Sequence, residues 1–532
     1  MKLQVSPMTL KPLGDSAWLV EYSALAVDVV RARVAGLVAA LATGRPQGVL
    51  DVVPSFNAVA VHFEHTDGIE IREWIGAAAV ADSLPEGREI EVPVIYDGAD
   101  LEQVAALTEM SVAAVVAMHS GAVYTVAAVG FTPGFPYLSG LPLRLHVPRR
   151  STPRRSVPAG SVALAGGQAG IYPCASPGGW HLLGRTGLRL FDPRQAPPAL
   201  LKCGDRVRFV AVDALEAVEE ISDPEISVGR IEVIEPGSLT TVQDLGRPGY
   251  ESAGVSPGGA VDRQALRQAN LIVGNPPGAA ALEACMCGPV LKFHAPAVVA
   301  WGGKSRLVET GETVDFSKLA GGLRAYLSVA GGLHIPDLLG SASTDLRAGF
   351  GGHGGRALRA GDWLDFGEPG RVPTPGAWQV GRGGRAPEIV LRFLPGAQGP
   401  WFSDAARMRF RTEVYRVMAD SDRMGARLSG PPLELAEPRE MISQPVACGS
   451  VQVPPDGQPI VLLAGRQTIG GYPQIGHVIS VDLPKLAGAW PGTAVRFREV
   501  TWEEAQGLKL QAEQDFKWLR TGLDLLSSRA CV

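Results

Sequence analysis

Two stretches of this sequence, about residues 90–210 and 385–500, carry the same landmarks in the same order. The matched landmarks are Tyr124 with Tyr415, Leu138-Ser139-Gly140 with Leu428-Ser429-Gly430, Gly160-Ser161-Val162 with Gly449-Ser450-Val451, and Val207-Arg208-Phe209 with Val495-Arg496-Phe497. Their separation along the chain is nearly constant, and chance does not produce an ordered series of this kind. We therefore expect both stretches to share one fold.

Two further similarities extend the repeat less securely. The string from Gln168 to Pro173 resembles the string from Gln467 to Pro473, but the pairing requires a longer loop in the second copy. The string Gly361–Phe366 resembles Gly204–Phe209, and a Gly-Asp turn before an alternating strand suits the last strand of a barrel. This similarity hints at a third copy within residues 230–370.

The composition favours short strands joined by tight turns, because Gly (65) and Pro (42) are abundant. The N-terminal region differs, with strand patterns at Ala17–Tyr22 and Val59–Phe63 and helical patterns at Val27–Leu41 and Ile69–Leu84. The predicted fold class is mainly β, with an α/β N-terminal domain and tandem barrels.

Two stretches have the composition of connectors, the acidic Val212–Val228 and the Pro/Gly/Arg-rich Glu368–Arg385. The predicted units are a small α/β domain (1–88), a barrel (89–225), a further barrel (226–378), the second copy of the repeated barrel (379–510) and a helical tail (511–532).

Charge and apolar patterning exclude several classes of protein. The net charge of −5 and the lack of a Lys/Arg block give no footprint for nucleic acid. No apolar run reaches the ~18 residues that a membrane span needs. The six cysteines are scattered and the nine histidines lack ligand spacing, which predicts a reducing, cytoplasmic compartment and no metal site.

Three strings imitate known catalytic motifs. Gly254–Gly258 fits G-x-S-x-G, but Pro257 follows the serine and has no N–H for an oxyanion hole, so we expect a turn before a helix around Asp262–Ile272. Gly349–Gly354 fits G-x-G-x-x-G, but no helix can follow it before Gly361. Gly303-Lys304-Ser305 lacks the leading glycine of a P-loop.

Several other strings are suited to binding a small molecule. The Pro- and Gly-rich run Val129–Leu141 fixes a rigid loop that suits either a pocket or a packed barrel corner. Arg149, Arg150, Arg154 and Arg155 follow it, and fixed guanidinium groups suit carboxylate or phosphate, although solvated surface arginines are equally consistent. In the second copy, the Gln, Arg and Asp side chains between Asp420 and Tyr472 suit an amide, whose N–H and C=O both need partners.

These strings resemble a known pair of protein families. Residues 9–210 resemble allophanate hydrolase subunit 1, which is also called the B subunit of 5-oxoprolinase, through Gly14-Asp15-Ser16, Asp51–Pro54, the string Gly130–Tyr137, Pro158–Ser161 and Ser176–Trp180. Residues 231–510 resemble allophanate hydrolase subunit 2, the C subunit of 5-oxoprolinase, through Thr241–Gly249, Gly274-Asn275, Leu282-Glu283, Gly340-Ser341, Ser421–Gly425 and Gln452–Pro459. The two modules joined together also resemble the carboxyltransferase part of urea amidolyase.

The resemblance implies cyclophilin-like β-barrels and one of two activities. A 5-oxoprolinase component would use ATP, with Mg, to activate the lactam of 5-oxoproline, and a separate protein like the A subunit of 5-oxoprolinase would complete hydrolysis to glutamate. A carboxyltransferase would move CO₂ from carboxybiotin, supplied in trans, to an amide such as urea. The family also includes kinase inhibitors, so a regulatory binding protein stays open, as does a homo-oligomer.

One string departs from the pattern expected for the second module, because Gly465 stands where an Asp is expected and Ile469 where a Thr is expected. An altered substrate or weakened activity would follow from this change.

We predict that the site lies between the two modules, because equivalent barrels often pair about a pseudo-two-fold axis. The predicted catalytic residues are Arg154, Asp422, Arg423 and Gln467. The predicted substrate-binding residues are Phe131, Phe135, Tyr137, Gly160, Ser161, Gln168, Tyr172, Gln452, Asp456 and Tyr472.

Overall fold

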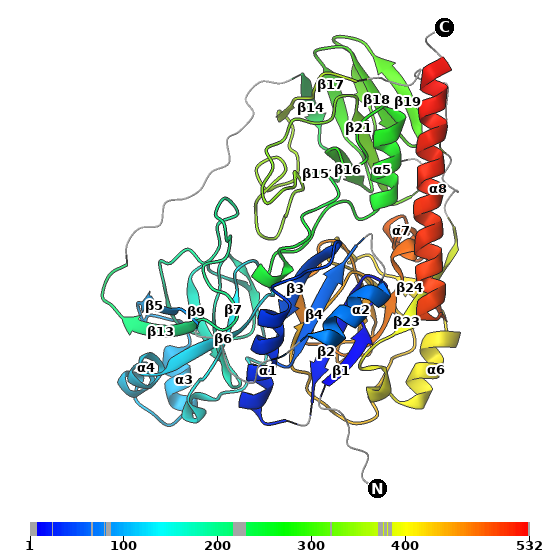
Figure 1. The fold of residues 1–532 in the computed structure, drawn as a ribbon. Coiled ribbons are helices and arrows are strands. Elements are labelled where there is room, and N and C mark those ends of the chain that lie inside the picture. Colours follow the sequence, from blue (N-terminus) through cyan, green and yellow to red (C-terminus); the bar gives the residue numbers. More distant parts are fainter. Residues whose placement is uncertain are drawn as a thin grey trace.

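The computed structural model describes residues 8–23, 25–64, 68–78, 80, 87–215, 230–319, 322–370, 376, 380 and 386–529. Most of both predicted connectors, and the C-terminal end of the predicted helix Ile69–Leu84, lie outside the described residues. Figure 1 shows the two repeated barrels on either side of the N-terminal unit, with the remaining β-rich segment above them.

The N-terminal unit is a four-stranded sheet in the order β1-β2-β4-β3, packed against two helices. Its elements are β1 (Met8–Pro12), β2 (Ala17–Tyr22), α1 (Val27–Ala40), β3 (Val49–Pro54), β4 (Ala58–Phe63) and α2 (Gly68–Ala77). The helices bury one apolar stripe, which in α1 includes Val30, Val34 and Leu37, against the sheet. The predicted strands Ala17–Tyr22 and Val59–Phe63 and the helix Val27–Leu41 are confirmed to within a residue. The predicted helix Ile69–Leu84 is confirmed only in its first part, since α2 ends at Ala77 and the described residues Ala78 and Val80 are not helical.

The first barrel follows. Its elements are β5 (Glu89–Val94), α3 (Leu101–Leu107), α4 (Val112–Ser120), β6 (Val123–Val129), β7 (Pro136–Ser139), the 3-10 turn η1 (Leu143–Leu145), β8 (Arg154–Val157), β9 (Ser161–Ala165), β10 (Gln168–Ile171), β11 (Ser176–Gly178), β12 (His181–Arg185) and β13 (Arg206–Ala211). Seven strands run in the order β12-β9-β10-β7-β6-β13-β5, and a bridge between Ile95 and Arg185 closes the circle.

The second repeated stretch forms a closed seven-stranded barrel. Its elements are β23 (Glu388–Pro395), the 3-10 turn η3 (Gly399–Trp401), α6 (Asp404–Thr412), β24 (Tyr415–Val417), β25 (Gly425–Ser429), β26 (Gln444–Pro445), β27 (Ser450–Gln452), β28 (Ile460–Leu462), β29 (Ile469–Gly470), β30 (Gln474–Val478), the 3-10 turn η4 (Ser480–Asp482), α7 (Leu483–Ala487) and β31 (Ala494–Glu499).

The two barrels have the same circular strand order, β5-β12-β9-β10-β7-β6-β13 and β23-β30-β27-β28-β25-β24-β31. In each barrel the last strand pairs in parallel with the first, β13 with β5 and β31 with β23. Each barrel also carries a separate two-stranded ribbon, β8–β11 in the first and β26–β29 in the second. The predicted shared barrel fold is therefore confirmed.

The structure corrects one pairing within the repeat. The ribbon strands show that Gly178-Gly179-Trp180 corresponds to Gly470-Gly471-Tyr472, since β11 and β29 hold the same place in their barrels. The predicted match of Tyr172 with Tyr472, and its longer loop, was wrong. Glycines recur at many turns of this chain, so a short string of glycines with one aromatic residue does not fix the alignment.

The segment between the barrels differs from the prediction of a further barrel at 226–378. Its described strands form a four-stranded sheet, β20-β17-β14-β22, and a five-stranded sheet, β15-β16-β21-β18-β19, which enclose an apolar core. The elements are β14 (Ile231–Glu235), β15 (Leu239–Gln243), the 3-10 turn η2 (Glu251–Ala253), α5 (Arg263–Ile272), β16 (Ala281–Cys285), β17 (Val290–Phe293), β18 (Ala297–Trp301), β19 (Lys304–Val308), β20 (Thr313–Asp315), β21 (Arg324–Val329) and β22 (Trp363–Leu364).

The predicted third copy of the repeat is not seen in this middle segment. Strand β22 pairs antiparallel with β14, whereas β13 and β31 pair in parallel with the first strand of their barrels. A Gly-Asp turn fixes how a strand begins but not which strand it pairs with, which explains why the Gly361–Phe366 string misled. The helix predicted after Gly254–Gly258 is confirmed as α5, capped by the Asp262 carboxylate.

The C-terminal helix α8 (Trp502–Arg529) begins earlier than the predicted tail and runs beside α5 (Figure 1). Trp502 stacks on Trp18 of the N-terminal unit, with ring centroids 4.7 Å apart. Further along, Arg267 of α5 pairs with Glu513 at 2.7 Å and lies over the Phe516 ring. The helix therefore joins the N-terminal unit to the middle segment. Within the described ranges no single helix is long and apolar enough to cross a membrane, and only the bent pair α3 and α4 passes that test by length and composition.

The 3-10 turn η2 and its flanks touch three other units of the chain. The amide of Ser252 donates to Asp51 of β3 at 2.8 Å, and Ala253 O accepts from Gly134 of the first barrel at 2.9 Å. The Ser256 hydroxyl donates to Ala464 O of the second barrel at 3.0 Å. These bonds fix the positions of both barrels relative to the N-terminal unit.

We predict that Gly254→Ala weakens this junction. Gly254 has φ +78°, and an added Cβ would lie 2.7 Å from Thr132 O, so the substitution adds a clash to the left-handed strain. The expected loss of stability is ~2–4 kcal/mol, measured as a fall in Tm by scanning calorimetry. Gly311→Ala is the matched control, with φ +84° and no atom within 4 Å, and should cost only ~1 kcal/mol. Equal effects would contradict a tight junction.

Candidate functional site

The loop after β6 and strand β7 place an aromatic cluster on the outer face of the first barrel. Side chains alternate along a strand, so Leu138 points into the barrel core while the neighbouring Tyr137 points outward. The Phe135 ring lies 5.0 Å from Tyr137 and 5.2 Å from Tyr172, and Trp180 completes the group. Phe135, Tyr137 and Tyr172 are buried, so the structure brings these predicted residues together as a packed wall.

The second barrel and the N-terminal unit complete this cluster. Ile469 of β29 belongs to it, and a Cβ added at Gly130 would lie 2.8 Å from the Ile469 side chain. Phe56 of the N-terminal unit lies 5.7 Å from the Tyr137 ring. Ile469 therefore fills an apolar position between the barrels, where the threonine of the expected string would place a hydroxyl.

Phe131 stands at the edge of the cluster with an uncommon backbone. Its φ of +69° is left-handed, which a bulky residue rarely adopts. Its ring lies 5.5 Å from Phe135, and the Arg347 guanidinium of the middle segment lies 4.5 Å above it. We call Phe131, Tyr137, Tyr172 and Arg347, together with Gln467, which lies two residues before Ile469 of the cluster, the interbarrel site.

Arg154, predicted to be catalytic, forms two hydrogen bonds of 2.8 Å to Asp100 within its own barrel. Arg150 donates to the same carboxylate at 2.6 Å. Burial raises the pKa of Asp100, but the bonds to Arg154, the Leu182 amide and Arg150 outweigh it, and the net pKa is lowered. The two guanidinium groups thus have a bonded counter-ion.

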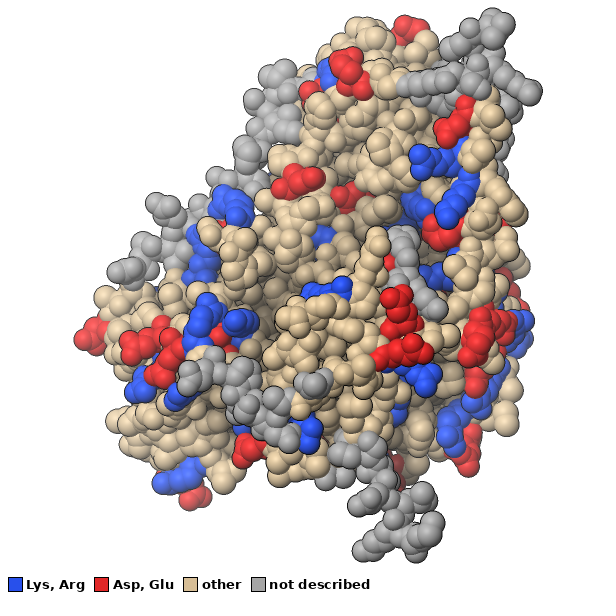
Figure 2. Space-filling view, in the orientation of Figure 1, with Lys and Arg blue, Asp and Glu red and all other residues tan. Residues whose placement is uncertain are grey.

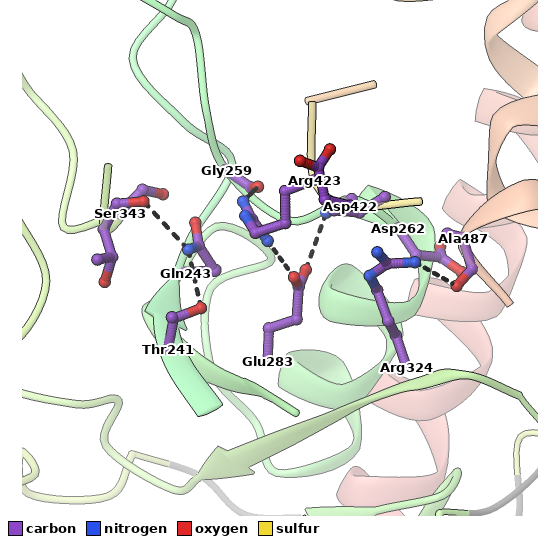
Figure 3. Close-up of polar contacts among 12 residues, drawn as sticks. Thr241, Gln243, Gly259, Asp262, Glu283, Arg324, Ser343, Asp422, Arg423 and Ala487 are labelled. Carbon is purple, nitrogen blue, oxygen red and sulfur yellow. Dashed lines mark hydrogen bonds and ion pairs between the residues drawn. The ribbon is translucent and has the colours of Figure 1, made fainter. Parts of the chain in front are cut away.

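Arg423, also predicted to be catalytic, crosses from the second barrel to the middle segment (Figure 3). It pairs with the buried Glu283 of β16 and donates to Gly259 O at 2.5 Å. Glu283 also accepts from Tyr326 and from the amide of Val261. Burial raises the pKa of Glu283, but Arg423 and Arg324 outweigh it, so the net pKa is lowered. Gly465, the other departure from the expected string, packs on the Arg423 backbone.

Gln467 and Gln452 lie together, as predicted, with Gln467 Nε2 donating to Gln452 Oε1 at 3.3 Å. Gln452 is buried, and its Nε2 group has no hydrogen-bond partner among the described residues. A buried amide donor without a partner is costly, so this group suits a ligand carbonyl or a water.

The other predicted residues of the second barrel lie at the surface. The exposed Asp422 carboxylate accepts from the amides of Met424 and Gly425. Asp456 caps an exposed turn by accepting from Gln458, and Tyr472 is half exposed.

In the first barrel, Gly160 and Ser161 support the wall instead of presenting groups to it. Gly160 has φ +79° and donates to Tyr172 O at 2.7 Å, and the Ser161 hydroxyl donates to Pro158 O. Gln168 opens β10 beside the β9–β10 turn, about 13 Å along the strand from Tyr172. The structure does not bring Gln168 to the cluster.

The sequence analysis did not predict Arg347, Phe56 or a buried polar group at the η2 junction. In this junction group Arg466 lies 3.7 Å from Glu251, and its Nε and Nη1 have no hydrogen-bond partner among the described residues. Burial, with a further contribution from Glu251, raises the pKa of Asp51 to about 6. The run of glycines around Arg347 could have pointed to this residue, because a glycine-rich loop can approach neighbouring units of the chain closely.

Charges of both signs are interspersed over the face in Figure 2, with Lys and Arg gathered beside Asp and Glu over the first barrel. This face therefore has no large surface of a single charge that would steer a polyanion or polycation to it.

Comparison with known proteins shows the same two modules. The family described as "Carboxyltransferase domain, subdomain C and D" matches residues 8–201, and "Carboxyltransferase domain, subdomain A and B" matches residues 253–499. The 5-oxoprolinase C subunit of Escherichia coli (strain K12) is 37% identical over 302 residues, which cover 54% of this chain and 94% of that protein. The 5-oxoprolinase B subunit of Escherichia coli O157:H7 is 46% identical over 172 residues, covering 30% and 78%.

Two further proteins match this chain over longer alignments. Urea amidolyase of Lachancea kluyveri is 30% identical over 329 residues, which cover 55% of this chain but only 18% of that protein. The crystal structure of TTHA0988 is 36% identical, with a TM-score of 0.80, and the match covers 91% of this chain and 99% of that one.

We predict that Arg423→Ala destabilises the contact between the second barrel and the middle segment. Removing one partner leaves Glu283 buried and charged, at a cost of about 3–5 kcal/mol. The double variant Arg423→Met, Glu283→Gln should recover most of the lost Tm. If turnover also returns in the double variant, Arg423 acts through structure; if stability returns without turnover, the predicted catalytic role stands.

We predict that Asp51 makes stability depend on pH. Its folded pKa lies above the ordinary 3.8, so its contribution to stability is complete below about pH 4 and is lost as the pH rises through about 6. Asp51→Asn stays uncharged, so between pH 4.5 and 7.5 the wild type should lose on the order of 2–3 kcal/mol relative to it. Calorimetry of both proteins, with the exposed-site variant Asp28→Asn as control, checks this; parallel pH profiles for wild type and Asp51→Asn would contradict it.

Proposed function

Because the chain belongs to the families of the B and C subunits of 5-oxoprolinase, joined in one polypeptide, we propose that it is the B/C component of an ATP-dependent 5-oxoprolinase. In this role it activates the lactam of 5-oxoproline, and a separate protein of the 5-oxoprolinase A type completes hydrolysis to glutamate in the cytoplasm. One observation carries the proposal: Ile469 of the C-like module packs into the aromatic cluster of the B-like module, so both modules build one site.

The chemistry of the interbarrel site suits a lactam. A lactam carbonyl needs a donor and its N–H needs an acceptor. The unpartnered Gln452 Nε2 supports the first role, and the Gln467 side-chain carbonyl is placed beside it for the second. The apolar wall of Phe135, Tyr137 and Tyr172 excludes water from one side of the ring.

ATP would supply the phosphoryl group that activates the lactam oxygen. Arg149, which acts electrostatically on Tyr137 and Tyr172 of the interbarrel site, is best suited to its phosphates, because its side chain is exposed and forms no ion pair or hydrogen bond within the described part of the chain. Burial raises the pKa of the neighbouring Tyr172 to about 12, and Arg149 acts in the opposite sense, which places the cation beside the aromatic wall.

A carboxyltransferase reaction on urea or a related amide is the second candidate, favoured by the match to both carboxyltransferase subdomain families and to urea amidolyase. In this alternative carboxybiotin, carried by another protein, would approach the same interbarrel site.

The test is reconstitution of the purified chain with a cognate 5-oxoprolinase A protein, ATP and 5-oxoproline. We expect glutamate release and ADP formation that require both proteins and 5-oxoproline. Gln452→Ala should lower kcat/KM by about tenfold or more, equivalent to ~1.4 kcal/mol, because it removes the buried donor. No 5-oxoproline-dependent ATP turnover, together with calorimetric binding of biocytin to the chain, would favour the carboxyltransferase.

A further inference from the structure

Arg347 brings a positive charge from the middle segment to the first barrel. It lies in the loop between Asp345 and Gly355, where Gly349, Gly351 and Gly352 have left-handed backbones and let the loop fold tightly. The guanidinium lies 4.5 Å above the Phe131 ring, a cation–π contact between two units far apart in sequence.

No hydrogen bond or ion pair reaches this guanidinium from the described residues. The two carboxylates that act electrostatically on Arg347 accept hydrogen bonds from backbone amides: Asp345 from Arg347 and Ala348 at 3.0 Å, and Asp422 from Met424 and Gly425. Among the other arginines around the site, Arg150, Arg154 and Arg423 each have a bonded counter-ion. Arg149 has none among the described residues either, but it is exposed to solvent, whereas Arg347 is partly buried.

Neighbouring residues partly shield the Arg347 side chain from solvent. Burial lowers its pKa, and the electrostatic effects of Cys174, Asp345, Tyr137 and Asp422 only partly offset this. Burial also raises the pKa of Tyr137, so that phenol stays neutral. A partly desolvated guanidinium whose N–H donors have no partner, next to neutral aromatic side chains, carries a desolvation cost. A carboxylate, which is planar and negatively charged, can offset this cost by accepting two parallel hydrogen bonds.

We propose that Arg347 binds the carboxylate of a small monoanionic substrate at the interbarrel site. The inference rests on the proposed function, since 5-oxoproline carries one carboxylate beside its lactam. A monoanion fits better than a triphosphate, because Asp345 and Asp422 already place two negative charges within electrostatic reach of Arg347. In this arrangement Arg347 of the middle segment holds the carboxylate, and Gln452 and Gln467 of the second barrel hold the lactam. The first barrel supplies the aromatic wall.

The test compares two lactams by isothermal calorimetry with the full chain alone. 5-Oxoproline has the carboxylate and 2-pyrrolidinone lacks it. We expect the wild type to bind 5-oxoproline at least tenfold more tightly, Arg347→Met to abolish that preference, and Arg347→Lys to keep part of it. Arg72→Met is the control, because Arg72 also lies over an aromatic ring, Trp18, has no bonded counter-ion among the described residues, and is exposed on the N-terminal unit.

Each outcome bears on the inference. A preference that survives in Arg347→Met, or wild-type protein that binds neither lactam, overturns it. Arg347-dependent binding of inorganic phosphate with no binding of 5-oxoproline overturns it as well and assigns the residue to the nucleotide. If 5-oxoproline binds through Arg347 but reconstitution with the 5-oxoprolinase A protein releases no glutamate, the carboxylate site stands and the proposed function fails.

Discussion

The η2 turn determines how the two barrels face each other. Residues of η2 bond to β3 of the N-terminal unit and to the Gly130–Gly134 loop, and the flanking Ser256 bonds to the turn that precedes Arg466. Each of these bonds uses at least one backbone group, and a buried backbone group has few alternative partners. A shift of η2 would therefore move both barrels and separate Ile469 from the aromatic cluster. The Arg423–Glu283 pair and helix α8 add to this arrangement from the other side of the middle segment.

The two barrels share a fold but contribute different chemistry. The first presents the aromatic residues of its outer face, while the second presents Ile469 from its ribbon, Gln452 from β27 and Gln467 from the segment before β29. Ser176 and Thr468 precede the paired glycines at corresponding positions, and both have a buried hydroxyl with no hydrogen-bond partner in the described part of the chain. Both barrels thus carry a buried hydroxyl at this ribbon position, whereas the aromatic wall belongs to the first barrel alone among the described residues.

The repeat predicted that two stretches share one fold, and the family resemblance implied that this fold is a barrel. Landmarks such as Tyr124 and Tyr415 are buried on corresponding strands, β6 and β24, which is why their shared order along the chain indicated a common fold. The same reasoning could not decide what each arginine does. Arg154 and Arg423 are engaged by Asp100 and Glu283, residues distant in sequence, whereas Arg347 is left without a bonded anion among the described residues. A guanidinium that is paired and one that is free look alike in a sequence, since the difference lies in which carboxylate the fold brings near.

The backbone of Phe131 connects the fold to the chemistry of the site. A left-handed conformation at a bulky residue costs about 1–2 kcal/mol, and it persists only where the surroundings determine it. Here Gly130 packs on Ile469, and Gly134 bonds to Ala253, so both ends of the short loop are held by other units. The strain turns the Phe131 ring to the edge of the cluster, under Arg347, instead of into the buried wall with Phe135. A loop that served packing alone would gain by relaxing this residue. The strained conformation is therefore best explained by the position that it gives to the ring and, through the ring, to the guanidinium above it.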